Sequence, residues 1–128
     1  MNACFVTGTD TGVGKTLVAA ALLHRLAERH ARVVGMKPVA AGADPDGTYE
    51  DVRALQAAST FKAAPELVNP YGLHLPVSPH IAARRDGTTI EIARIVDACA
   101  ALRAQADAVV VEGAGGFRDD DQIGRAHV

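Results

Sequence analysis

The 128-residue sequence has no tryptophan, two cysteines and an aromatic content of 4%, and its net charge is only −2. With 13 basic and 15 acidic residues, it lacks the basic surplus typical of proteins that bind nucleic acids or anionic membranes. No apolar run approaches the roughly 18 residues that a membrane-spanning helix needs. We therefore expect neither a nucleic-acid nor a membrane partner, and the apolar content of 48% predicts a packed core.

The cysteines and the N-terminal residues bear on the compartment. Cys4 and Cys99 lie far apart in apolar stretches and match no metal-binding or redox spacing, which predicts buried, reduced thiols. Residues 1–4 carry no basic segment of a signal peptide. Together these features predict a cytoplasmic protein.

Hydrophobic periodicity predicts alternating strands and helices. An apolar run at 4–6 enters a glycine-rich turn, a helix follows over 17–30, and a second strand covers 32–36. This order of strand, helix and strand is a βαβ unit, which predicts a parallel sheet. The continuously apolar segment 107–111 is typical of a central strand in such a sheet.

The region between these strands predicts three further helices. Two short helices are expected over 50–59 and 81–85, and a longer one begins after Thr88 or Thr89 and ends near Gln105. The proline-rich stretch 69–80 predicts an irregular connection. The positions expected to face inward on the helices at 50–59 and 88–105 are Val52, Leu55, Gln56, Ile92, Ile95, Val96, Cys99 and Leu102.

The glycine-rich turn runs from Gly8 to Gly14 and is followed by Lys15 and Thr16. Such a loop, between a strand and a helix, brings backbone N–H groups and a helix N-terminus close to phosphate groups. Lys15 would contact the β- and γ-phosphates of a nucleotide, and the Thr16 hydroxyl would bind Mg²⁺. The strict phosphate-loop spacing is not met, because Thr9 stands where that pattern has its first glycine.

Three more residues are candidates for the same crevice. Glu112 ends the most apolar strand, and Lys37 follows the second strand, so both are expected at the carboxyl edge of a parallel sheet. Glu112 would contact nucleotide-bound magnesium, or it is an ordinary acid at an exposed turn. Lys37 would stabilise an anionic substrate, or it is a solvent-facing lysine before a turn. Asp51 is either a third magnesium contact or a helix-capping acid.

Five motifs in sequence order resemble those of dethiobiotin synthetases. They are Phe5–Thr16, Met36–Gly42, Asn69–Tyr71, Ser78–His80 and Val111–Gly116. The resemblance implies a three-layer α/β P-loop NTPase with a mostly parallel, doubly wound sheet, which is incomplete in this chain. It further implies a homodimeric enzyme of biotin synthesis that requires ATP and Mg²⁺. That enzyme carboxylates 7,8-diaminononanoate with CO₂ and closes the ring to give dethiobiotin, ADP and phosphate.

The resemblance also implies roles for individual residues. The implied ATP-binding residues are Gly12, Val13, Gly14, Lys15, Thr16, Leu17, Asp51, Glu112, Gly113, Ala114 and Gly115. The implied magnesium ligands are Thr16, Asp51 and Glu112, and the implied substrate contacts are Thr11, Lys37 and Ala41. Lys37 and Lys15 would be catalytic, with Lys37 stabilising the carbamate and the mixed carbamic-phosphoric anhydride. Ala41 stands where the family often has serine, so only a backbone contact is possible there.

Two other classes of P-loop ATPase remain alternative interpretations of this sequence. One is a partition-type ATPase, although its signature lysine would stand where this chain has Asp10. The other is the nucleotide domain of a cobyrinate-type amidotransferase.

We expect the chain to contain only part of an NTPase domain. Residues 1–117 read as the N-terminal part of an NTPase domain, because three strands are evident where a doubly wound sheet usually has five or six. Residues 118–128 depart from the family pattern, and 123–128 match the translation of a sequencing-adapter-like DNA stretch, so we expect an artefact of sequencing or assembly. The 128-residue chain alone is expected to be inactive.

Overall fold

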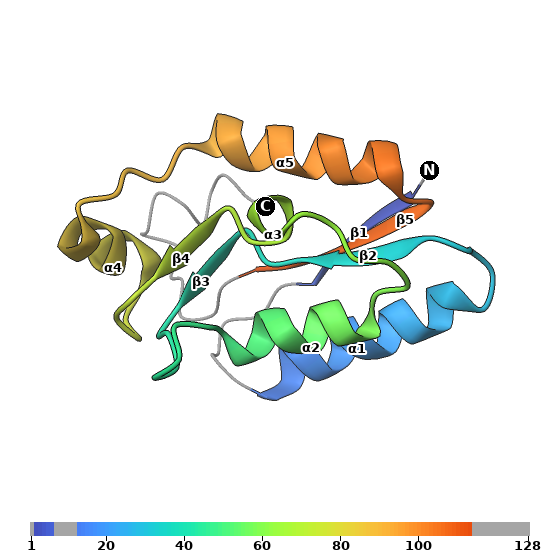
Figure 1. Ribbon diagram of the computed structural model, residues 1–128, viewed down its shortest axis with the longest axis horizontal. Helices are drawn as coiled ribbons and strands as arrows, with labels where there is room; N and C mark the ends of the chain where they lie inside the picture. Colours follow the sequence, from blue (N-terminus) through green and yellow to red (C-terminus); the bar gives the residue numbers. More distant parts are fainter. Residues whose placement is uncertain (1, 7–12, 114–128) are drawn as a thin grey trace.

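The computed structural model describes residues 2–6 and 13–113 (Figure 1). The predicted site residues Thr11, Gly12, Ala114 and Gly115, together with the tail 118–128, lie outside the described residues. The elements in chain order are β1 (Asn2–Val6), α1 (Val13–Ala27), β2 (Val33–Met36), β3 (Val39–Ala41), α2 (Glu50–Ala58), α3 (Pro65–Val68), β4 (Tyr71–Leu73), α4 (Pro79–Asp86), α5 (Ile92–Gln105) and β5 (Ala108–Glu112).

The strands of the described part form two parallel sheets. The larger has the order β1-β5-β2, and the smaller pairs β3 with β4. Strand β5 is central because Val110 pairs with Cys4 on one side and with Gly35 on the other. Every residue of β5 is buried, as its continuous apolar sequence predicted.

The larger sheet lies between two helical layers, with α5 and α3 on one face and α1 and α2 on the other (Figure 1). Successive strand side chains point to opposite faces. Val109 and Val111 therefore pack with Leu102 of α5, whereas Val110 packs with Leu23 of α1 and with α2. This arrangement confirms the three-layer α/β prediction.

The outer edge of β2 is covered by the chain that follows α2. The Val33 N–H donates to Thr60 Oγ1 at 2.9 Å, and the Gly35 N–H donates to Ser59 Oγ at 3.0 Å. A Cβ at Gly35 would lie 2.9 Å from Leu55 Cβ, so glycine allows α2 to pack directly against β2. This close packing fixes the position of α2 relative to the sheet.

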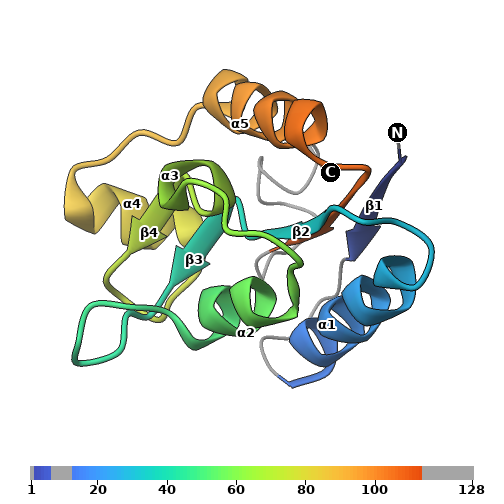
Figure 2. The same ribbon diagram turned by 45° about the vertical axis from the view of Figure 1, so that its right-hand side comes forward.

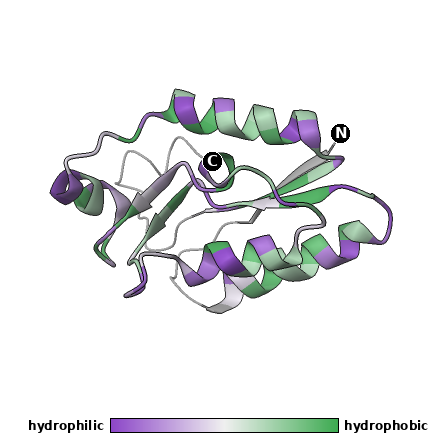
Figure 3. Cartoon of the chain, viewed as in Figure 1, coloured by the Kyte–Doolittle hydropathy of each residue, from purple (hydrophilic) through white to green (hydrophobic). Residues whose placement is uncertain are grey.

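Hydrophobic residues concentrate in the central strands, while the helices carry both hydrophobic and hydrophilic residues (Figure 3). No helix of the described residues is long and apolar enough to cross a membrane.

Several predicted boundaries were wrong for identifiable reasons. Helix α1 runs from Val13 to Ala27 instead of over 17–30. It begins inside the glycine-rich segment, and residues 28–30 form a turn that ends it. Neither Thr88 nor Thr89 caps α5, whose N-cap is Glu91. Instead the Thr88 N–H donates to the Ala83 carbonyl at 2.8 Å and closes the end of α4.

The stretch 69–80 is not wholly irregular, because it contains β4 and the start of α4, and helix α3 precedes it. Three positions expected to face inward are exposed, namely Gln56, Ile92 and Val96. Helix α2 packs through Leu55 and Ala58 instead, and α5 packs mainly through residues 95, 98, 99 and 102. Short strands and a one-turn helix contain too few residues to show a periodic pattern.

Candidate active site

Four predicted site residues meet at the carboxyl edge of the larger sheet, three of them in α1, α2 and β5 and one directly after β2. Lys37 follows β2, Glu112 ends β5, Thr16 lies in the first turns of α1, and Asp51 lies in the first turn of α2. The carboxyl ends of parallel strands share one edge, so β2 and β5 bring Lys37 and Glu112 together although 75 positions separate these two residues.

The Lys37 ammonium is the centre of this cluster. Its Nζ donates to Glu112 Oε2 at 2.9 Å, to Asp51 Oδ2 at 3.1 Å and to the Gly113 carbonyl at 3.5 Å. The side chains of Lys37 and Glu112 are only 5% and 1% exposed, whereas that of Asp51 is 45% exposed. Lys37 is therefore not a solvent-facing lysine, and Glu112 is not an acid at an exposed turn.

The same carboxylate oxygen of Glu112 also contacts α1. The Thr16 hydroxyl donates to Glu112 Oε2 at 2.8 Å. The other oxygen, Oε1, is buried and has no hydrogen-bond partner among the residues that the structure describes. A buried carboxylate oxygen of this kind can still accept a cation or a donor.

The donor chemistry of the cluster fits a magnesium ion. Magnesium prefers hard oxygen ligands and is usually held by one or two carboxylates together with nucleotide phosphates. Thr16, Asp51 and Glu112 supply one hydroxyl and two carboxylates within one hydrogen-bonded network. The orphaned Glu112 Oε1 is a further oxygen available to such an ion.

The start of α1 presents the remaining phosphate-binding candidates. Lys15 is buried, Thr16 is half-buried and Gly14 is exposed. A Cβ at Gly14 would meet no described atom within 4 Å, so the backbone there is open to a ligand. Val13 begins the helix, and the Leu17 side chain is 71% exposed.

The structure does not bring Ala41 into this cluster. Ala41 ends β3, pairs with Leu73 and packs against the core formed by β3, β4 and α4. Gly42 follows with a φ of 81°. A substrate contact at Ala41 therefore stays a prediction.

Side-chain contacts connect the loop before α2 to that helix. Arg53 pairs with Asp44 at 2.9 Å and also donates to Thr48 Oγ1. The neighbouring Asp44 carboxylate raises the pKa of Arg53, and hydrogen bonds from Thr48 lower the pKa of Asp46. These exposed contacts hold the chain that leads to Asp51.

Cys99 lies away from the cluster, on α5. It is half-buried rather than buried, and burial raises the pKa of its thiol while Arg103 opposes that effect. The side chain of Cys4 lies outside the described residues.

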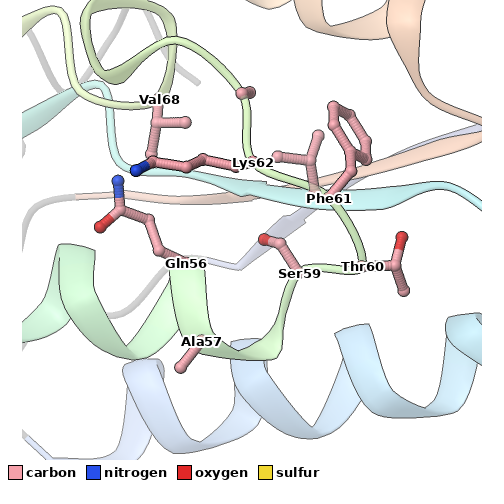
Figure 4. Close-up of a pocket in the computed structure, with 9 residues that line it drawn as sticks. Gln56, Ala57, Ser59, Thr60, Phe61, Lys62 and Val68 are labelled. Carbon is pink, nitrogen blue, oxygen red and sulfur yellow. The ribbon is translucent and has the colours of Figure 1, made fainter.

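A cavity of about 470 Å³ lies elsewhere, beside the covered edge of β2 (Figure 4). It is lined by Val34, Gln56, Ala57, Ser59, Thr60, Phe61, Lys62, Ala63 and Val68. None of these residues belongs to the Lys37 cluster.

One contact of the cluster was not anticipated from the sequence. The side-chain amide of Asn69 donates to the Lys37 carbonyl at 2.7 Å. The motif Asn69–Tyr71 is part of the family resemblance, but nothing in its composition indicates which backbone group the amide would reach.

A protein family and several curated relatives match most of this chain. The sequence profile of the AAA domain family matches residues 2–126. The chain is 56% identical over 118 residues to the ATP-dependent dethiobiotin synthetase BioD of Ralstonia nicotianae, covering 90% of this chain and 52% of the relative. It is 55% identical over 113 residues to the protein of the same name from Nitrosospira multiformis, covering 88% and 50%.

The chain thus spans about half the length of the curated relatives that it matches. The family profile, by contrast, covers nearly the whole sequence. The chain therefore belongs to the AAA domain family.

Proposed function

We propose that residues 1–117 form the phosphate- and metal-binding part of a dethiobiotin synthetase. Such an enzyme carboxylates 7,8-diaminononanoate with CO₂ and closes the cyclic urea at the expense of ATP, and we expect it to be a cytoplasmic homodimer. The observation that carries the proposal is the convergence of Thr16, Lys37, Asp51 and Glu112 on one hydrogen-bonded network beside Lys15. The names of the relatives support the choice of this reaction over the other ATPases.

Each residue has a role that follows from the group it would contact. The backbone of residues 12–17 and the Lys15 ammonium hold the nucleotide phosphates. Thr16, Asp51 and Glu112 would hold Mg²⁺, and residues 113–115 would line the nucleotide. A bound Mg²⁺ would supply positive charge to the β- and γ-phosphates.

Lys37 acts on the substrate. One amine of the diamino acid adds to CO₂ and loses a proton, giving a carbamate anion. A carbamate oxygen attacks the γ-phosphorus of ATP, ADP leaves, and the second amine then attacks the carbonyl carbon and expels phosphate. A fixed ammonium beside the carbamate stabilises the anion and the charge that develops during phosphoryl transfer, with little reorganisation.

The position of Lys37 supports this role. Its buried side chain pairs with two carboxylates, which hold the ammonium in place. Glu112 and Asp51 therefore bring the lysine to the place where the metal and the phosphates are expected to meet.

The test is dethiobiotin formation from diaminononanoate, bicarbonate and MgATP by the full-length protein and its variants. We expect Lys37→Ala to lower turnover about 100- to 1,000-fold, the usual loss for one preorganised charge contact. Its MgATP affinity should change little, whereas Thr16→Val and Glu112→Gln should weaken both MgATP binding and turnover.

The exposed Lys62 provides a matched control, because Lys62→Ala removes the same charge outside the cluster. Near-normal turnover of Lys37→Ala would remove its catalytic role. ATP hydrolysis without any dethiobiotin from the unmodified protein would favour one of the other P-loop ATPases.

A further inference from the structure

The backbone of Lys37 is held from outside the larger sheet. The ladder between β2 and β5 ends with the pair Met36 and Val111, so Lys37 is the first residue beyond it. Its N–H donates to the Val68 carbonyl at 2.8 Å, and its carbonyl accepts the Asn69 amide at 2.7 Å. Val68, at the end of α3, and Asn69, which follows it, therefore supply both of these hydrogen bonds. Helix α3 lies beside the chain that joins β2 to β3 (Figure 2).

The Asn69 side chain links Lys37 to the start of β4. Its Nδ2 also donates to the Tyr71 carbonyl at 3.0 Å, and the Tyr71 N–H donates to the Pro38 carbonyl at 3.1 Å. Two carbonyl oxygens around one amide fix its orientation, because only the nitrogen end of the amide can donate. The Asn69 N–H bonds the Pro65 carbonyl at 2.8 Å, which anchors the residue to the end of α3.

We propose that Asn69 is a positioning residue for Lys37. The inference rests on the role of Lys37 proposed above and assigns Asn69 no contact with substrate. The lysine ammonium must stay within hydrogen-bond distance of Asp51 and Glu112, at the end of a flexible four-carbon chain. A shift of its backbone moves the whole chain, and a displacement of about 1 Å can cost about 100-fold in rate.

Val68 accepts the hydrogen bond of the Lys37 N–H, and Asn69 holds the Lys37 carbonyl. Pro38 restricts Lys37 to extended backbone conformations but donates no hydrogen bond of its own. The Asn69 amide is therefore the side-chain donor that holds the Lys37 carbonyl in place.

The decisive variant is Asn69→Asp in the full-length protein. Aspartate has nearly the same shape, but it replaces the donor with a carboxylate oxygen that faces two carbonyl oxygens. We expect kcat for dethiobiotin formation to fall about 10- to 100-fold. The KM for MgATP should stay within about 2-fold, because Lys15 and Thr16 lie on α1.

A double-mutant cycle with Lys37→Ala separates positioning from general stability. If Asn69 acts through Lys37, adding Asn69→Asp to Lys37→Ala should change kcat less than about 2-fold. A full additional loss in that background would overturn the inference, because it would show an effect independent of Lys37. Gln105→Glu makes the same amide-to-carboxylate change at an exposed site on α5 and should leave kcat unchanged.

The outcomes also separate this inference from the proposed function. Normal kcat in Asn69→Asp, together with an inactive Lys37→Ala, would overturn the inference alone. Normal kcat in Lys37→Ala would remove the catalytic role of Lys37 on which the inference rests, whereas absence of dethiobiotin formation by the unmodified protein would overturn the proposed function itself. Should Asn69→Asp not fold, Asn69→Ser keeps one donor and is expected to show a smaller loss of kcat in the same cycle.

Discussion

Lys37 is paired with two carboxylates that differ greatly in burial. The Glu112 side chain is 1% exposed and that of Asp51 is 45% exposed, although both oxygens lie within 3.1 Å of the same ammonium. Water screens the Asp51 contact, whereas Glu112 and Lys37 compensate each other in a desolvated environment. The two carboxylates should therefore contribute unequally to stability.

The matched variants Glu112→Gln and Asp51→Asn test this difference. We expect Glu112→Gln to lower the free energy of unfolding by about 3 kcal/mol, because it leaves a buried ammonium without its main partner. Asp51→Asn should cost less than about 1 kcal/mol, as is usual for a solvent-screened pair. Urea denaturation of the full-length protein, without nucleotide or metal, gives both values. Equal losses would show that burial does not distinguish the two pairs.

The helices and strands that could be predicted from the sequence are those that are long or strongly patterned. The apolar strand β5 and the helices α1, α2 and α5 were all expected, and β5 is central as predicted. Strands β3 and β4 and helix α3 were missed, because elements of three or four residues carry almost no periodic signal.

The candidate site, too, could be predicted only in part. Lys37 and Glu112 could be placed near each other because the carboxyl ends of parallel strands share an edge. The contact between Asn69 and Lys37 could not be predicted, because it depends on how an unpredicted helix and strand pack beside β2. The catalytic, metal-binding and substrate-binding roles themselves remain predictions.

The first turn of α1 allows a test of phosphate binding. Gly14 is exposed, and a Cβ there would meet no described atom within 4 Å. Gly14→Ala should leave stability unchanged or raise it by up to about 1 kcal/mol, because alanine is the better helix former. The added methyl group would nevertheless keep a phosphate away from the backbone, so we expect ATP affinity to fall at least about 10-fold.

Calorimetric titration with ATP and thermal unfolding of the same Gly14→Ala sample provide the two measurements. An unchanged ATP affinity would contradict phosphate binding at this turn. Loss of folding would instead show that the glycine is required for the structure.

Across the fold, one small cluster links elements that are distant in sequence. Thr16 and Glu112 are 96 positions apart, and Lys37 and Asp51 are 14 apart, yet all four share one hydrogen-bonded network. Helices α1 and α2 pack on the same face of the sheet, and β5 is its central strand. A ligand that binds to this network would therefore contact α1, α2 and β5 at once.

Hydrogen exchange of the full-length protein should reveal that coupling. A ligand that binds only the native state stabilises it by about 2.7 kcal/mol at 100 times its Kd. With MgADP we expect slower exchange at the start of α1, at the start of α2 and at the end of β5, with little change in α4. With ADP and a chelator, protection should remain at α1 but be lost at α2, because Asp51 is expected to contact the nucleotide through the metal. Asp51→Asn should abolish the metal-dependent protection of α2 and leave that of α1. Equal exchange of α2 with and without Mg²⁺ would exclude Asp51 from the metal site.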